Sequence, residues 1–137
     1  MEKEYSLSSL NNQELYVLPI YIKAPKSLSD KAISLNKQLS EELIKIDKPK
    51  RSVKLGRALS KILNDYPKDI VVKDFDVLFN PAYKVDVLTL LLTEYRNKPF
   101  SIIWPGTYSD GKLIYSEPCY QDYHVYSISN YDVACIV

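Results

Sequence analysis

Hydrophobic positions along the chain fall into short apolar runs and longer segments with helical spacing. The run Ile-Val-Val at 70–72 is typical of a strand buried on both faces. Apolar residues three or four positions apart then predict a helix over 80–97, which an Asn-Pro pair would begin. A second apolar run at 100–104 completes a strand–helix–strand unit. Such a unit predicts a parallel βαβ crossover, with candidate sites where its strands end, near 73–76 and 104–106.

The pattern extends to both sides of this unit. Residues 1–14 are polar and predict a flexible or short helical lead-in. A strand is expected at 16–22, and Pro19 inside it favours a sheet edge or a bulge because proline cannot donate to a ladder. Ser27 is expected to cap a helix, and the stripe of apolar residues after it predicts that this helix continues to Ile46. The remaining elements are expected as a helix at 52–66 capped by Ser52, a hairpin turn at 107–111, and strands at 112–116, 123–128 and 131–137.

These elements predict a single α/β domain over residues 15–137. Its sheet is expected to be mainly parallel, with a small antiparallel annex at the C-terminal end. The sequence shows neither a signal peptide nor an apolar run of about 18 residues, so a cytoplasmic protein without membrane association is expected. Cys119 and Cys135 have no motif spacing, which favours reduced thiols and disfavours zinc.

Charge narrows the possible partners. The chain has 18 Lys and Arg residues against 17 Asp and Glu residues, which argues against nucleic-acid binding through bulk charge. A local basic cluster nevertheless leaves open a DNA-binding accessory, against the plainer interpretation of a solvated helix junction. The residues of this cluster are Lys45, Lys48, Lys50, Arg51, Lys54 and Arg57.

Two short stretches are candidates for nucleotide chemistry. Residues 23–27 (Lys-Ala-Pro-Lys-Ser) lie where a nucleotide-binding α/β protein places its phosphate loop, with Lys26 and Ser27 as candidate phosphate ligands. The stretch has no glycine, so an ordinary strand-to-helix connection is favoured. Asp74 and Asp76 follow a buried strand and could hold magnesium, but the adjacent lysine favours a simple polar strand exit.

The C-terminal third is rich in tyrosine. Residues 107–137 contain Lys112 as their one Lys or Arg, against four acids, which disfavours base stacking in a basic groove. Aromatic side chains on a weakly acidic surface suit a protein interface, or they simply roof the sheet edge, and both interpretations stay open. His124 is the single histidine and is expected to be structural or solvated.

Four motifs together suggest a family. They are Leu-Phe-Asn-Pro at 78–81, Arg-Asn at 96–97, Trp-Pro-Gly at 104–106 and Gly-Lys-Leu-Ile-Tyr-Ser-Glu-Pro at 111–118. In these motifs the chain resembles the small P-loop ATPase-like protein encoded in some BREX bacteriophage-defence systems. The resemblance covers about residues 34–137, and 68–118 is its specific part.

The resemblance implies a three-layer, P-loop-NTPase-like α/β fold with helices on both faces of the sheet. It also implies a degenerate relative, because the family's glycine-rich Walker A loop is missing here. Lys73 stands where the family has its Walker B acid, and Asp76 stands where a second acid is expected. Arg96 matches a family arginine that could serve a neighbouring nucleotide.

The leading hypothesis is therefore a non-catalytic binding or scaffold subunit of a bacterial antiphage system, without a cofactor. Its partners would be other proteins of the system, such as a large ATPase or a DNA-modifying enzyme, with DNA reached indirectly. The candidate interface residues are Trp104, Tyr115, Tyr120, Tyr123 and Tyr126. One alternative is a residual ATP-binding protein or ATPase that uses magnesium with Lys26, Ser27, Asp74, Asp76 and Arg96. The other is a DNA-binding accessory that uses Lys50, Arg51, Lys54 and Arg57.

Overall fold

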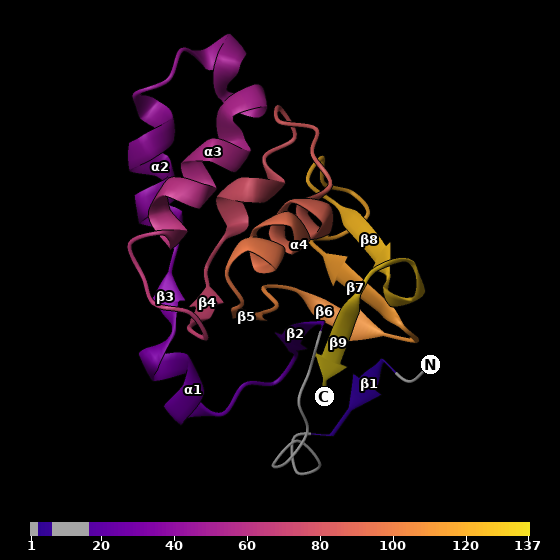
Figure 1. The fold of residues 1–137 in the computed structure, drawn as a ribbon. Helices are drawn as coiled ribbons and strands as arrows, with labels where there is room; N and C mark the ends of the chain where they lie inside the picture. The colour runs from indigo at the N-terminus through magenta and orange to yellow at the C-terminus, as the bar shows by residue number, and fades with distance from the viewer. Residues whose placement is uncertain (1–2, 7–16) are drawn as a thin grey trace.

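The computed structural model describes residues 3–6 and 17–137 (Figure 1). These residues form a parallel sheet of six strands in the order β1-β9-β2-β5-β4-β3, and an antiparallel sheet of three strands in the order β6-β7-β8. The α/β class, the parallel sheet and the antiparallel annex are confirmed. The strands of the parallel sheet are β1 (Glu4–Tyr5), β2 (Leu18–Tyr21), β3 (Ile33–Ser34), β4 (Val71–Lys73), β5 (Ser101–Ile103) and β9 (Val133–Ile136). Those of the annex are β6 (Thr107–Ser109), β7 (Lys112–Tyr115) and β8 (His124–Ser127).

Four α-helices and three 3-10 turns lie within the described residues. The α-helices are α1 (Lys26–Lys31), α2 (Asn36–Ile44), α3 (Arg51–Leu63) and α4 (Val87–Asn97). The 3-10 turns are η2 (Lys48–Lys50), η3 (Asp76–Phe79) and η4 (Ile128–Asn130). Among the described residues, no helix is both long and apolar enough to cross a membrane.

The two faces of the parallel sheet are covered unequally. One face carries fully buried side chains, including Ile20, Val72 and Ile102, which join the apolar residues of α2, α3 and α4 in one core. On the opposite face Tyr21 and Val71 are half-buried beside α1, which has no buried residue of its own. Among the described residues, the helical layer expected on this second face is therefore reduced to α1.

The central βαβ unit is confirmed. Strands β4 and β5 are parallel neighbours joined through α4, and Val72 pairs with Ile102. The hairpin turn is also confirmed, because Asp110 and Gly111 between β6 and β7 have φ values of 50° and 74°. Positive φ at both central residues is the geometry of a type I′ turn, whose twist matches the flanking strands.

The long helix predicted from Ser27 to Ile46 is wrong. The structure divides it into α1, β3 and α2, because Ile33 pairs with Val72 at the edge of the sheet. The backbone amide of Leu35 extends this pairing by donating to the carbonyl of Lys73 at 3.1 Å. The apolar spacing that predicted one helix thus runs through β3, a strand of two residues.

The helix predicted from Asn80 also begins later than expected. Residues 76–79 form η3, and α4 starts after Asp86, whose Oδ1 accepts from the Thr89 amide at 3.0 Å. Asn80 instead accepts from the Ala82 amide with its own Oδ1, which makes a local turn. The predicted caps at Ser27 and Ser52 are wrong as well, since α1 and α3 have no side-chain cap.

The expectation that Pro19 places its strand at an edge is wrong. Strand β2 is central, between β9 and β5. The amides of Leu18 and Ile22 donate to Asp132 and Ile136 on the β9 side. Alternate residues of a strand direct their amides to opposite sides, so the missing donor of Pro19 faces β5, where pairing begins only at Ile20.

The N-terminal segment contributes a strand that the sequence did not predict. Glu4 and Tyr5 pair in parallel with Cys135 and Ile136 of β9, so β9 lies inside the sheet rather than at its edge. The rest of the 1–14 lead-in, apart from residues 3 and 6, lies outside the described residues.

Candidate functional site

The carboxyl ends of the parallel strands gather the residues with candidate chemistry. Lysine 73 ends β4, Trp104 follows β5, Lys23 follows β2 and Val137 follows β9. The Trp104 amide donates to the Tyr21 carbonyl at 2.9 Å, which fixes the exit of β5 against β2. In open parallel sheets this edge is where ligands bind, so each predicted residue is judged by what it contacts here.

A buried aromatic cluster joins the annex to this edge. The rings of Phe79 and Tyr115 stack with centroids 3.7 Å apart, and Trp104 meets Phe79 and Tyr126 edge-on at 5.7 and 6.1 Å. Trp104 Nε1 donates to the Ile114 carbonyl at 3.0 Å. The cluster places the antiparallel sheet over the ends of β4 and β5.

Three predicted interface residues belong to this cluster and are not surface groups. Trp104, Tyr115 and Tyr126 are 3%, 9% and 5% exposed, because the annex packs against η3 and the exit of β5 there. Tyr120 is 59% exposed and Tyr123 is half-buried, so they remain as the accessible part of the predicted interface.

The two candidate metal acids hold neighbouring segments together. Asp76 accepts from Asn36 Nδ2 at 3.1 Å and from the Tyr115 hydroxyl at 2.9 Å, one partner for each carboxylate oxygen. Asp74, at a φ of 50°, accepts from the Ser34 hydroxyl at 2.9 Å. Among the described residues, no group of three His, Cys, Asp or Glu side chains is placed to hold a metal ion.

Tyr115 is affected in turn by this acid. Burial raises the pKa of the Tyr115 phenol, and the hydrogen bond to the Asp76 carboxylate raises it further. The phenol therefore remains a hydrogen-bond donor to the carboxylate at neutral pH, which keeps η3 attached to β7.

Lys73 has a structural partner. Its Nζ donates to the Ser29 carbonyl at 2.9 Å and so connects β4 to α1. Lys26 and Ser27 are exposed residues at the start of α1, a helix of six residues that begins directly after Pro25. The lysine at the Walker B-like position thus serves the packing of a short helix.

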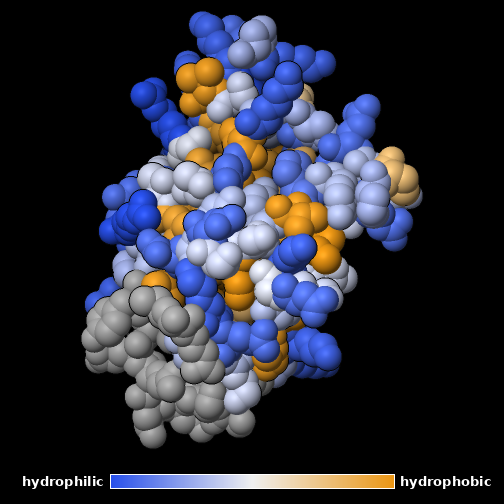
Figure 2. Space-filling view, turned by 90° about the vertical axis from the view of Figure 1, so that its right-hand side faces the viewer, coloured by the Kyte–Doolittle hydropathy of each residue, from blue (hydrophilic) through white to orange (hydrophobic). Residues whose placement is uncertain are grey.

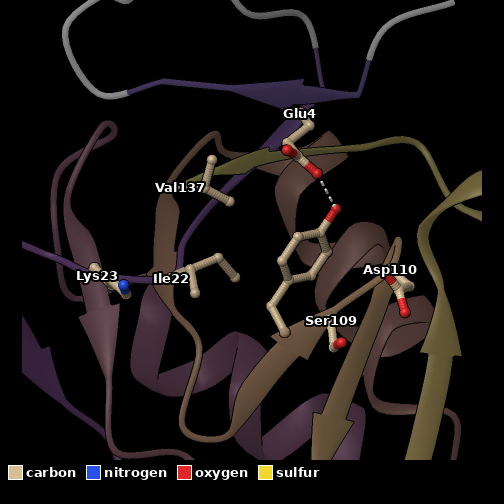
Figure 3. Close-up of a pocket in the computed structure, with 7 residues that line it drawn as sticks. Glu4, Ile22, Lys23, Ser109, Asp110 and Val137 are labelled. Atoms are coloured by element: carbon tan, nitrogen blue, oxygen red, sulfur yellow. Dashed lines mark hydrogen bonds between the residues drawn. The ribbon is translucent and has the colours of Figure 1, made fainter.

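A pocket of about 420 Å³ lies at the end of β2 (Figure 3). Its lining residues are Glu4, Ile22, Lys23, Tyr108, Ser109, Asp110 and Val137. Lys23 lies on one side, and Ser109 and Asp110 on the other (Figure 3). The Tyr108 hydroxyl donates to Glu4 Oε2 at 2.5 Å, and burial, reinforced by this bond, raises the pKa of Tyr108.

Sequence analysis missed this pocket because its residues come from four separate segments. Glu4 falls in the predicted lead-in, and Lys23 is three positions before the lysine chosen as a phosphate ligand. The available signals were the position of Lys23 directly after a strand and the Asp-Gly turn at 110–111. The residues of the pocket make a polar opening that carries both positive and negative side chains. Such an opening defines no reaction by itself.

The remaining candidates are at the surface. Arg96 Nη2 lies 3.7 Å from Asp132 Oδ2, and both side chains are more than 60% exposed, so this ion pair contributes little. The Arg51 Nε donates to the Ile46 carbonyl at 2.9 Å. His124 Nδ1 lies 2.8 Å from the Asp122 carbonyl oxygen, and its ring stacks with Tyr126, which indicates a structural role.

The two cysteines lie in different environments. Cys119 is an exposed free thiol, and Cys135 is a buried free thiol in β9. Burial raises the pKa of Cys135 to about 12, so this sulfur stays a neutral core group.

Comparison of the chain with models of protein families, with curated proteins and with solved structures found no match.

Proposed function

We propose that this chain is a non-catalytic binding subunit built on a P-loop-derived sheet, and that it works in bacterial antiphage defence. In this role it holds other proteins of the same system, such as a large ATPase or a DNA-modifying enzyme. It needs no cofactor of its own. The proposal combines the motif resemblance at 68–118 with the arrangement of the strands.

The strand order supports a P-loop origin. Numbered from β2 along the chain, the five strands β9-β2-β5-β4-β3 have the order 5-1-4-3-2. Strand β5 therefore separates β2, which would lead into a phosphate loop, from β4, which would end in a magnesium acid. P-loop ATPases with one strand inserted between their two Walker strands have this order.

One observation carries the non-catalytic part of the proposal. The groups at the two Walker-like positions are used in contacts within the chain: Lys73 binds the Ser29 carbonyl, and both oxygens of Asp76 accept hydrogen bonds. An ammonium group at the strand end would also repel a magnesium ion. The edge is thus better suited to packing than to phosphate transfer.

The accessible aromatic surface supports protein binding. Tyr120 and Val125 are 59% and 42% exposed, and Tyr123 is half-buried between them in sequence. Tyrosine offers a large contact area at low entropic cost, and the annex that carries these residues is weakly acidic. We therefore place the partner contact on Tyr120, Tyr123 and Val125.

The binding role is tested with purified proteins of the same defence system as baits. Tyr120→Ala with Val125→Ala should lower the affinity for one of them at least tenfold, as expected for an aromatic contact at an interface. The paired control is Ile44→Ala with Val53→Ala, which removes two exposed apolar side chains from a distant helical junction. Equal affinities for the two double variants would reject this surface.

Residual nucleotide binding is the second candidate, and the pocket at the end of β2 is the observation in its favour. Lys23 lines that pocket and Lys26 does not, so the lysine to vary is Lys23. Titration calorimetry with ATP or ADP and magnesium should give no heat from the folded chain. Micromolar binding that Lys23→Ala abolishes would instead make nucleotide binding the leading function.

A further inference from the structure

The exposed face of α3 is a ridge of positive charge. Leu55, Ala58, Leu59, Ile62 and Leu63 direct the opposite side of the helix into the core. Four cations at i, i+4, i+7 and i+11 lie along this side over about 16 Å; the first ends η2, the second is half-buried and the other three are exposed. These cations are Lys50, Lys54, Arg57 and Lys61, and we call them the α3 ridge.

Most of the ridge charge is unpaired. Lys61 binds Glu42 at 3.0 Å, and Lys45 binds the same carboxylate at 3.3 Å. Within residues 3–6 and 17–137, Lys50, Lys54 and Arg57 form no ion pair. The sequence from 48 to 64 also contains no acidic residue, so nothing on the helix itself neutralises them.

The ridge makes the molecule electrically asymmetric. Residues 42–61 contain seven cations and two acids, whereas the whole chain has a net charge of +1. The rest of the chain therefore carries a net charge of −4. Figure 2 shows mostly hydrophilic side chains, with some hydrophobic ones between them, over the upper end of the molecule, where α2 and α3 meet in Figure 1. Such a distribution turns this end toward a polyanion as it approaches.

We propose that the α3 ridge binds the phosphodiester backbone of a nucleic acid. The amino-acid composition of the ridge favours a nucleic acid over an acidic protein as the partner. Residues 48–61 contain no aromatic residue, and three of the four ridge cations are lysines. Protein interfaces are enriched in aromatic residues and depleted in lysine, whereas lysine and arginine are the usual phosphate ligands. The contact carries no base readout, so the binding is independent of sequence.

The proposal is tested by fluorescence anisotropy with a short labelled DNA duplex, using the full chain. Three phosphate contacts give a log–log salt slope of about −2.7, which corresponds to about 40-fold weaker binding between 50 and 200 mM salt. The triple variant Lys50→Glu, Lys54→Glu, Arg57→Glu should weaken binding at least tenfold and remove most of the slope. The control is Lys31→Glu, Lys68→Glu, Lys112→Glu, three exposed lysines elsewhere, with the same change in net charge.

The outcomes separate the possible causes. A loss confined to the ridge variant, with both variants showing wild-type circular dichroism, supports the proposal. A duplex RNA in parallel identifies which nucleic acid is preferred. An equal loss in both variants would show that bulk charge is responsible and would overturn the ridge. Polyglutamate that binds as tightly as DNA and is lost in the same variant would assign the ridge to an acidic protein instead.

Discussion

The Trp-Pro-Gly turn illustrates how single residues fix the annex to the sheet. Trp104 Nε1 donates to the Ile114 carbonyl, and the backbone at Gly106 approaches the same oxygen. A Cβ at position 106 would overlap that carbonyl. The glycine is therefore required by the close approach of β7 and not by its own φ angle.

Gly106→Ala should destabilise the protein by about 3 kcal/mol, because the new methyl group must displace the backbone of β7. Urea denaturation would measure the change. The matched control is Gly56→Ala on α3, where a Cβ would lie 3.4 Å from Leu90 Cδ1, an ordinary contact. That substitution should stabilise by up to about 1 kcal/mol through helix propensity. Equal effects of both substitutions would contradict the close approach.

Asp76 offers a second test at the scale of one side chain. Its two hydrogen bonds connect α2 and β7 to η3, so Asp76→Asn should cost about 1–3 kcal/mol of unfolding free energy. Magnesium should leave the thermal midpoint of both proteins unchanged. If magnesium raised the midpoint of the wild type and not of the variant, Asp76 would be a metal ligand.

The sequence identified the important side chains more reliably than their roles. Trp104, Tyr115 and Tyr126 were singled out as surface residues, whereas the structure buries them. Tyrosine is compatible with either environment, and its burial here depends on the contacts of the annex with η3 and with Trp104. The partners of Asp76 come from positions about 40 residues away on both sides, which no local pattern contains.

At the scale of elements, local sequence patterns predicted the regular helices and strands, and they missed the elements that depend on pairing with a distant strand. The spacing of apolar residues located α3, an apolar run located β5, and the Asp-Gly pair located the 107–111 hairpin. It could not show that Ile33 leaves a helical stripe to pair with Val72, because the partner strand lies 39 residues further along. Nor could it show that Pro19, which has no amide to donate, comes just before Ile20, where the pairing of β2 with β5 begins.

The start of α4 gives a prediction at this scale. Asp86 accepts from the Thr89 amide and, with its other oxygen, from the Tyr131 hydroxyl at 2.6 Å. Asp86→Ala should therefore lower stability by about 1–2 kcal/mol. Asn80→Ala should cost less than about 0.5 kcal/mol, since Asn80 makes only a local turn. If Asn80→Ala lowered the unfolding free energy more than Asp86→Ala in chemical denaturation, the helix would begin at Asn80, as the sequence predicted.

Phenol groups that burial keeps neutral connect elements from all parts of the molecule. Burial raises the pKa of Tyr126 to about 12 and also raises the pKa of Tyr108, Tyr115 and Tyr131. Hydrogen bonds to carboxylates reinforce the effect at Tyr108, Tyr115 and Tyr131. These bonds connect β6 to β1, β7 to η3, and the β9 approach to α4, so the folded state depends on protonated phenols.

This dependence predicts alkaline unfolding. A phenol whose pKa is raised by folding contributes stability that is complete below its ordinary pKa of about 10. The contribution is lost as the pH rises toward 12, because the unfolded chain then releases the proton more readily. In an absorbance titration, the tyrosines with a raised pKa should ionise late, together with unfolding. Tyr126→Phe should reduce the amplitude of this late step, because Tyr126 is buried. A single titration near pH 10, with the fold still intact at pH 11, would show that these phenols are open to solvent and that the annex is not packed on η3 and the exit of β5 as described.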